Sequence, residues 1–155
     1  RLPGLTVVAA DVDPRAVACA ARNLAAVGGT AVAGDLDGPL PDALRGRVDV
    51  IVANVPYVPS AAVALMPPES RDHEPRGTVD GGADGLDLLR RVAALAPRWL
   101  RPGGALLSEV ADGDQAEAAR AAYAAAGLAA RLDHDGEREA TVVTGVRSAA
   151  ASRRH

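Results

Sequence analysis

The segment Val48-Asp49-Val50-Ile51-Val52-Ala53-Asn54-Val55-Pro56-Tyr57 decides how the rest of this chain is interpreted. Its first six residues form an apolar run whose length and β-branched composition are typical of a buried parallel strand. The last four residues, Asn54 to Tyr57, follow that strand directly. Ligands in open α/β sheets bind at the carboxyl ends of the strands. The segment therefore predicts a strand that carries a polar loop to a binding site.

The chemistry of this loop suits a planar NH2 group. The Asn54 side-chain oxygen and the backbone carbonyl of Val55 can accept both hydrogens of an amide or exocyclic amine and aim its nitrogen at an electrophile. Pro56 keeps the loop extended, and Tyr57 offers a flat π surface to the planar group or to a cation. These four residues are the candidate catalytic residues, although asparagine and proline after a strand are also common turn residues.

The composition is compatible with one compact enzyme domain. The chain has 155 residues, of which 48% are hydrophobic and 24% charged, and this is enough apolar material for a core. We expect the domain to span residues 1–147, and we expect residues 148–155, which lack apolar periodicity, to be disordered. The formal net charge of -3 gives no general attraction for nucleic acid, so a protein or small-molecule substrate is favoured.

Cysteine and histidine usage predicts neither a disulfide nor a metal site. The single cysteine, Cys19, falls in a helical pattern and is expected to be a small core residue. His73, His134 and His155 are scattered rather than grouped at metal-ligand spacing. The chain also shows no signal-peptide layout and no apolar run long enough to span a bilayer, so we expect a cytoplasmic location.

Short apolar runs alternate with helical patterns, which predicts an α/β fold with an open, mostly parallel sheet and an antiparallel pair of strands at one edge. Asp13-Pro14 predicts a helix start, Asp84 is a second candidate cap, and Asp114 with Glu117 forms a capping-box pattern. The expected strands are 6–10, 30–33, 48–53, 105–110, 129–132 and 141–146, and the expected helices are 14–27, a segment from 84 onwards, and 114 to a stop at 127.

Three polar residues fall at or just beyond the ends of different strands: Asp11, Asp35 and Asn54. The two oxygens of Asp11 can accept from both hydroxyls of a ribose, and Asp13 already fills the helix cap that Asp11 could otherwise serve. For Asp35 a ligand role and an ordinary Gly-Asp turn stay equally open.

At this point the residues resemble a known family, the class I S-adenosylmethionine-dependent methyltransferases, and among them the release-factor glutamine methyltransferases of the HemK/PrmC type. The resemblance extends from Thr6 to about Val146. Its specific parts are the box from Asn54 to Pro59, the loop 67–76 and the segment 80–87. The box alone is shared with amino methyltransferases acting on nucleic-acid bases, and the loop is what indicates glutamine.

The resemblance implies a Rossmann-like sheet and the cofactor S-adenosylmethionine. It implies that Asp11 and Val12 bind the cofactor ribose, that Asp35 and Leu36 lie against its adenine, and that Asn54 serves both the cofactor and the substrate amide. The implied acceptor is the glutamine of a Gly-Gly-Gln loop in a peptide-chain release factor, and the implied reaction is direct methyl transfer to its side-chain nitrogen. We expect the enzyme to be a monomer.

The long loop between residues 55 and 83 exceeds the usual length of a connection, which favours a functional role over a solvated surface loop. We hypothesise that it forms a rim around the amide pocket, with Glu74 and Arg76 as candidate polar contacts. Gly81, Gly82 and Gly85 lack the Lys-Ser/Thr ending of a phosphate loop, so turn chemistry explains them better.

Two features depart from the family pattern. Val55 replaces a proline, which leaves the backbone carbonyl in place. The chain also has no Gly-x-Gly and opens just before the strand that the family would number second, so we expect a fragment that lacks the central first strand. Such a chain should be unstable and should bind S-adenosylmethionine poorly. The alternatives are a nucleic-acid amino methyltransferase and a non-catalytic nucleotide-binding or interaction module.

Overall fold

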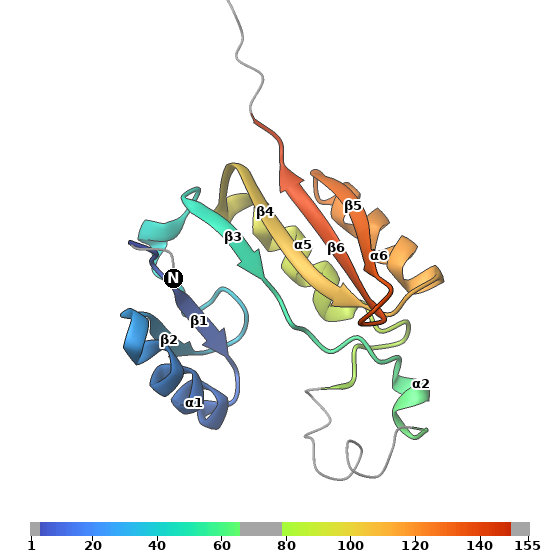
Figure 1. Ribbon diagram of the computed structural model, residues 1–155, viewed down its shortest axis with the longest axis horizontal. Helices are drawn as coiled ribbons and strands as arrows, with labels where there is room; N and C mark the ends of the chain where they lie inside the picture. Colours follow the sequence, from blue (N-terminus) through green and yellow to red (C-terminus); the bar gives the residue numbers. More distant parts are fainter. Residues whose placement is uncertain (1–3, 66–78, 150–155) are drawn as a thin grey trace, which may run out of the picture. The chain divides into compact units, whose positions relative to one another are not determined.

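A computed structural model of the chain describes residues 4–65 and 79–149. The chain divides into two compact units, residues 1–44 and residues 45–155, and each unit has its own sheet (Figure 1). The first sheet has the strands β1 and β2, and the second has the order β3-β4-β6-β5. The predicted span of one domain, 1–147, stays a prediction.

The first unit is a β-α-β element made of β1 (Val8–Asp11), α1 (Pro14–Leu24) and β2 (Thr30–Ala33). The two strands are parallel, and their register runs from Val8 opposite Thr30 to Asp11 opposite Ala33. The predicted helix start is confirmed, because the Asp13 carboxylate accepts the Arg15 N–H at 2.8 Å. A short 3-10 turn, Ala25–Val27, follows α1 and ends at Gly28, whose φ of 70° suits glycine.

Side chains in the first unit are half-buried at most. Among residues 4–44 none is fully buried. Cys19 is exposed, so the prediction that it is a core residue is wrong. The reason is that one helix on two strands cannot enclose a side chain on all sides.

The second unit contains the larger sheet. β3 and β4 are parallel, β4 and β6 are antiparallel, and β5 and β6 are antiparallel. The predicted α/β class, with parallel pairing and an antiparallel pair near the carboxyl terminus, is therefore confirmed. The strands are β3 (Val48–Val52), β4 (Leu100–Val110), β5 (Leu128–Asp135) and β6 (Ala140–Arg147).

Strand β3 differs from its prediction in burial. Val50 is 55% exposed and Val52 is 76% exposed, so β3 is not the buried strand that its apolar run predicts. Within the described ranges β1 pairs only with β2, and β3 pairs only with β4. Among the described residues, β3 therefore stands at the edge of its sheet.

The start of β4 contains a bulge that the sequence predicts as a turn. Val48 pairs with Leu100 but Val50 pairs with Ala105, so the residues 101–104 bulge out of the ladder. Gly104 lies against β3, because a Cβ there would be 2.7 Å from the Val48 carbonyl oxygen. Only glycine permits this close approach of the two backbones.

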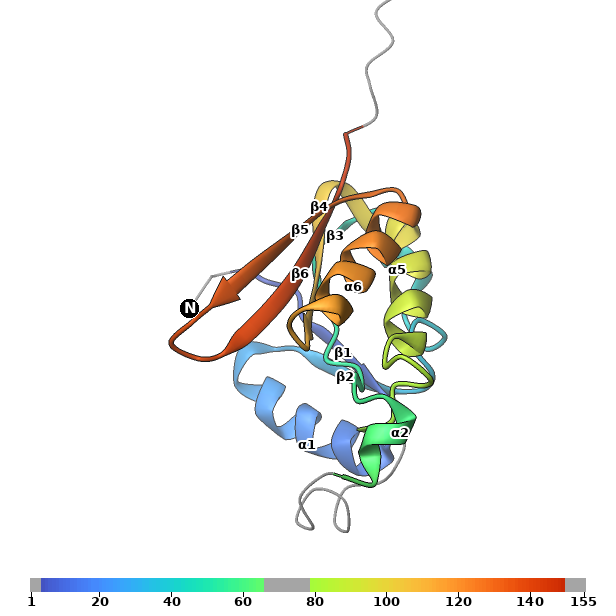
Figure 2. The ribbon, with the colours of Figure 1, turned by 90° about the vertical axis from the view of Figure 1, so that its right-hand side faces the viewer.

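Helices α5 (Asp87–Trp99) and α6 (Asp114–Ala125) pack on one face of the larger sheet (Figure 2). Tyr123 is fully buried on α6, and its hydroxyl donates to the Ser108 hydroxyl on β4 at 2.8 Å. Burial raises the pKa of Tyr123 to about 12, so its hydroxyl stays protonated. The largest fully buried side chains of this core are Tyr123, Leu86, Leu89, Leu100, Leu106 and Val143.

Two predicted helix caps are wrong. Helix α5 begins at Asp87 after Leu86, and Asp84 lies outside it, where its carboxylate accepts the Leu86 N–H at 3.2 Å and pairs with Arg90. Helix α6 has Gly113 as its N-cap, with φ 72°, and makes no side-chain cap bond. Asp114 is therefore the first helical residue, where its charge still favours the positive end of the helix dipole.

Candidate functional site

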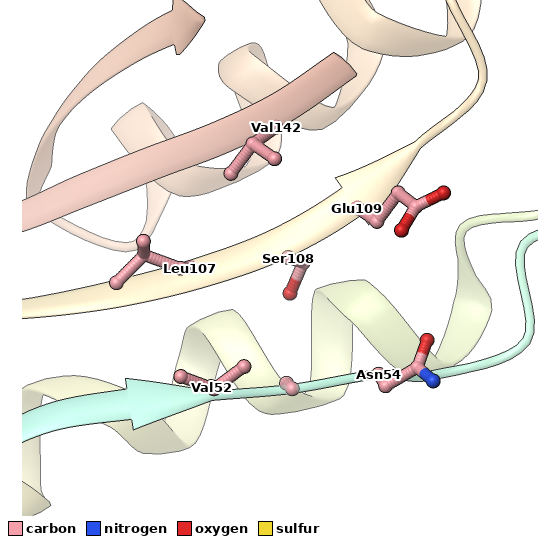
Figure 3. A pocket seen from close by; sticks show the side chains of 7 residues that line it. Val52, Asn54, Leu107, Ser108, Glu109 and Val142 are labelled. Carbon is pink, nitrogen blue, oxygen red and sulfur yellow. The ribbon is translucent and has the colours of Figure 1, made fainter. Parts of the chain in front are cut away.

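The Asn54–Tyr57 loop leaves the sheet at the carboxyl end of β3. The Ala53 N–H donates to the Leu107 carbonyl at 2.9 Å, which ties the start of the loop to β4. A cavity of about 320 Å³ opens there in the second unit (Figure 3). Its walls are Val52, Ala53, Asn54, Leu107, Ser108, Glu109 and Val142. The cavity is mainly apolar, with the Asn54 carboxamide and the Glu109 carboxylate as polar groups at one end.

Both predicted acceptors of the loop are available. Asn54 is exposed, while the side chain of Val55 is buried and anchors the loop. Among residues 4–65 and 79–149, no group donates a hydrogen bond to the Asn54 carboxamide oxygen or to the Val55 carbonyl. A buried or internally paired arrangement would have ruled out amide binding, and the structure shows neither.

Tyr57 is held from α6 and lies beside a charge on β4. Its carbonyl accepts the Gln115 side-chain N–H at 2.8 Å. Partial burial raises the pKa of the Tyr57 hydroxyl, and the negative charge of the Glu109 carboxylate and its hydrogen bonding raise this pKa further. The hydroxyl is therefore neutral at physiological pH. The sequence patterns indicate neither Glu109 nor Gln115, although Glu109 is the penultimate residue of the predicted strand 105–110.

The segment 79–87 packs directly against the loop, backbone to backbone. The Val58 N–H donates to the Val79 carbonyl at 3.2 Å, and the Gly81 N–H donates to the Val58 carbonyl at 2.8 Å. Gly85 has φ 79°, and a Cβ there would be 2.2 Å from the Tyr57 carbonyl oxygen. The structure thus joins two of the sequence motifs, and it assigns these glycines to turns and close packing.

The candidate cofactor residues Asp11, Val12, Asp35 and Leu36 are in the first unit. Asp11 ends β1, where it pairs with Ala33, and Asp35 lies two residues beyond the end of β2, so both are at the carboxyl end of the small sheet. Asp11 accepts the Asp13 N–H through Oδ1 at 2.8 Å, and its second oxygen accepts no hydrogen bond within the described ranges. Val12 is 67% exposed, and Leu36 has a positive φ of 48°. An exposed carboxylate beside apolar side chains fits a nucleoside chemically.

Glu74 and Arg76, the candidate rim residues, lie outside the described residues. Helix α2 (Ser60–Val63) is the described part of that long connection on its amino-terminal side. The Ser60 hydroxyl donates to the Asp80 carboxylate at 2.6 Å, which fastens the two described ends of the connection to each other. Within the described ranges, none of the helices has the length and apolar composition required to cross a membrane.

Comparison with known sequences finds relatives that are named as glutamine methyltransferases. The chain is 44% identical over 119 residues to the release factor glutamine methyltransferase of Geobacter sulfurreducens, which covers 76% of this chain and 40% of the relative. It is 42% identical over 130 residues to the release factor glutamine methyltransferase of Cereibacter sphaeroides, which covers 82% of this chain and 45% of the relative. It is 43% identical over 115 residues to the ribosomal protein uL3 glutamine methyltransferase of Bradyrhizobium diazoefficiens, which covers 72% of this chain and 35% of the relative.

Solved structures show the same fold. A methyltransferase from Pyrococcus furiosus superposes with a TM-score of 0.62 at 15% identity, over 93% of this chain and 64% of the other. The E. cuniculi Mtq2–Trm112 complex is responsible for methylation of the translation termination factor eRF1. It superposes with a TM-score of 0.51 at 19% identity, over 94% of this chain and 88% of the other. No protein-family profile matches the chain.

These matches confirm the resemblance to the release factor glutamine methyltransferases that the two sequence motifs indicate. The methyltransferase fold is confirmed as well. The chain spans about two fifths of the length of the curated relatives, from 35% to 45% in the three named here.

Proposed function

We propose that this chain forms the amide-binding part of an enzyme that transfers a methyl group from S-adenosylmethionine to a glutamine side chain in a protein. A peptide-chain release factor is the first candidate substrate. The observation that carries the proposal is the pair of open acceptors, Asn54 and the Val55 carbonyl, at the carboxyl end of β3. The sequence identity of 40 to 44% to enzymes named for this reaction supports it.

The Asn54–Tyr57 loop would act by orientation. An amide nitrogen is a poor nucleophile, because its lone pair is delocalised into the carbonyl. Asn54 and the Val55 carbonyl would accept its two N–H bonds, and the Tyr57 ring would support the flat face of the group. Holding the nitrogen in line with an electrophile is worth several kcal/mol. The chain needs no base before attack, since the proton can leave once the nitrogen carries the methyl group.

S-adenosylmethionine, when bound, supplies an electrophilic methyl group on a positively charged sulfur. In the first unit, Asp11 would accept hydrogen bonds from ribose hydroxyls, Val12 would support the ribose, and Asp35 with Leu36 would lie against the adenine. In the second unit, the Glu109 carboxylate and the Tyr57 ring supply the negative potential that favours a cation.

A ribosomal protein is a second candidate substrate, because one relative at 43% identity is named for ribosomal protein uL3. Methylation of a nucleic-acid base is less favoured, since the named relatives act on protein glutamine. A non-catalytic module is less favoured for the same reason. A substrate that acts in translation would place the enzyme in the cytoplasm, and we propose that it works as a monomer.

Radiolabelled S-adenosylmethionine tests the proposal directly. The full-length protein is incubated in parallel with a release factor, ribosomal protein uL3, tRNA and DNA, and the label is located by mass spectrometry. We expect the label on a glutamine side chain of the release factor. Label on tRNA or DNA, or no label on any substrate, would contradict the proposal.

Asn54→Ala tests the residue that carries the argument. Losing this acceptor should lower turnover at least about 100-fold, by analogy with the loss of one positioned polar group in other enzymes. Asn23→Ala is the matched control, because Asn23 is an exposed asparagine on α1 and should leave turnover unchanged. Full activity of Asn54→Ala would remove Asn54 from the mechanism.

A further inference from the structure

We propose that Gln115 is a positioning residue for methyl transfer: its side-chain amide holds the Tyr57 carbonyl, so that Asn54 and the Val55 carbonyl are the acceptors left for the substrate. This inference rests on the proposed function, and it assigns a role to a residue on α6 that no sequence motif indicates. Gln115 touches the backbone of the loop and not the reacting atoms.

The Gln115 side chain joins three segments of the second unit. Its oxygen accepts the Ala111 N–H at 2.9 Å, just beyond the end of β4. Its nitrogen donates to the Tyr57 carbonyl at 2.8 Å and to the Asp84 carbonyl at 3.1 Å. The two hydrogens and the oxygen of the amide are thus all used, and the residue is half-buried.

The backbone of two glycines packs closely around this amide and the loop. A Cβ on Gly85 would be 2.5 Å from the Gln115 side-chain nitrogen and 2.2 Å from the Tyr57 carbonyl oxygen. A Cβ on Gly81 would be 2.7 Å from the Pro56 carbonyl oxygen. The backbone at Gly85 and Gly81 therefore lies close against the Tyr57 and Pro56 carbonyls.

The three consecutive carbonyls of the loop have different surroundings. The Pro56 carbonyl faces Gly81, and the Tyr57 carbonyl is bonded by Gln115. The Val55 carbonyl has no donor within the described ranges. Because the ring of Pro56 restricts the φ angle between them, holding the Pro56 and Tyr57 carbonyls limits the directions that the Val55 carbonyl can take. Gln115 therefore acts on the acceptor geometry through the backbone, from 58 residues away.

The substitution Gln115→Glu separates the functions of this amide. A glutamate has the same size and keeps the oxygen that accepts the Ala111 N–H, but it has no N–H for the Tyr57 and Asp84 carbonyls. Gln115→Met is the second variant, which keeps the size and removes every hydrogen bond without adding charge. Glu117→Gln is the matched control. Glu117 is exposed in the same turn of α6, and this substitution replaces a carboxylate by an amide away from the loop.

The experiment uses the full-length protein and two measurements. Hydrogen exchange reports the position of the loop through the Val58 and Gly81 amides, which donate to the Val79 and Val58 carbonyls, and turnover on the release factor reports the consequence. We expect both Gln115 variants to exchange these amides at least about tenfold faster, with β4 and β6 unchanged. We also expect kcat to fall at least about tenfold, while the KM for S-adenosylmethionine and the melting temperature change little.

The outcomes are distinguishable. Unchanged exchange at Val58 and Gly81 in both variants would overturn the positioning role. A fall in kcat that matches a loss of folded protein would also overturn it, because Gln115 would then act on stability alone. An inactive parent protein with faster loop exchange in the variants would refute the proposed function and leave the positioning of the loop by Gln115 supported.

Discussion

The two units of this chain differ in how much of their structure they can stabilise by themselves. Residues 4–44 form two short parallel strands and one helix, and none of these residues is fully buried. The second unit has a four-stranded sheet, two helices on one face and a core that includes Tyr123 and Leu106. The acceptor loop belongs to the second unit, and the candidate ribose residue Asp11 belongs to the first. The acceptor loop thus has a packed support within its own unit, whereas Asp11 has little support within its own.

Hydrogen exchange on the 155-residue chain would show the largest difference. Backbone amides in β4 and β6 should exchange at least about 100-fold more slowly than amides in β1 and β2, because opening of the first unit exposes almost no buried apolar surface. Nuclear magnetic resonance resolves the individual amides. Equal protection in the two units would show that the first unit is as stable as the second, which would contradict the difference in stability described above.

Gly145→Ala tests the core of the second unit. A Cβ at Gly145 would be 2.6 Å from Cδ2 of the Tyr123 ring, so the substitution overpacks β6 against α6. We expect the free energy of unfolding to fall by about 1–3 kcal/mol in urea titration. Gly136→Ala is the matched control, since a Cβ there meets nothing closer than 4.0 Å. Equal stability of the two variants would show that β6 and α6 can separate without cost.

The smallest expected effect is a change in melting temperature that depends on the start of α1 in the first unit. The Arg15 guanidinium, hydrogen-bonded to the Asp13 carboxylate, lowers the pKa of that carboxyl. A lowered pKa in the folded state stabilises the fold above the unfolded pKa of about 3.9, and this contribution is lost as the pH falls through the lower folded value. The melting temperature of the chain should therefore exceed that of Asp13→Asn slightly at pH 6, and the difference should shrink as the pH falls below about 3.9. A constant difference across this range would contradict the ion pair.

Local signals in the sequence predict local structure well. Asp13-Pro14 marks the start of α1, and Thr30–Ala33 is the predicted second strand in full. The Asn54–Tyr57 loop is where its strand predicts it, with open acceptors. These features depend on residues within a few positions of each other, so one chain segment contains the information.

Features that depend on distant residues could not be predicted. One local pattern also fails, because Gly113 adopts φ 72° and takes the cap position that the capping-box pattern gives to Asp114. Gln115 escaped detection because its partners, Tyr57 and Asp84, are 58 and 31 residues away. The apolar run 48–53 overestimates the burial of β3, because the composition of a strand does not indicate which neighbouring elements cover it.

The edge position of β3 has a consequence for handling the molecule. A strand with one unpaired edge and exposed valines is a template on which a strand of another molecule can add, which is how many aggregates begin. Asp49 is the only charged residue in β3, and Arg101 of the adjacent bulge pairs with it at 2.6 Å. The solubility of concentrated preparations would then depend on a single carboxylate, and neutralising it would favour precipitation.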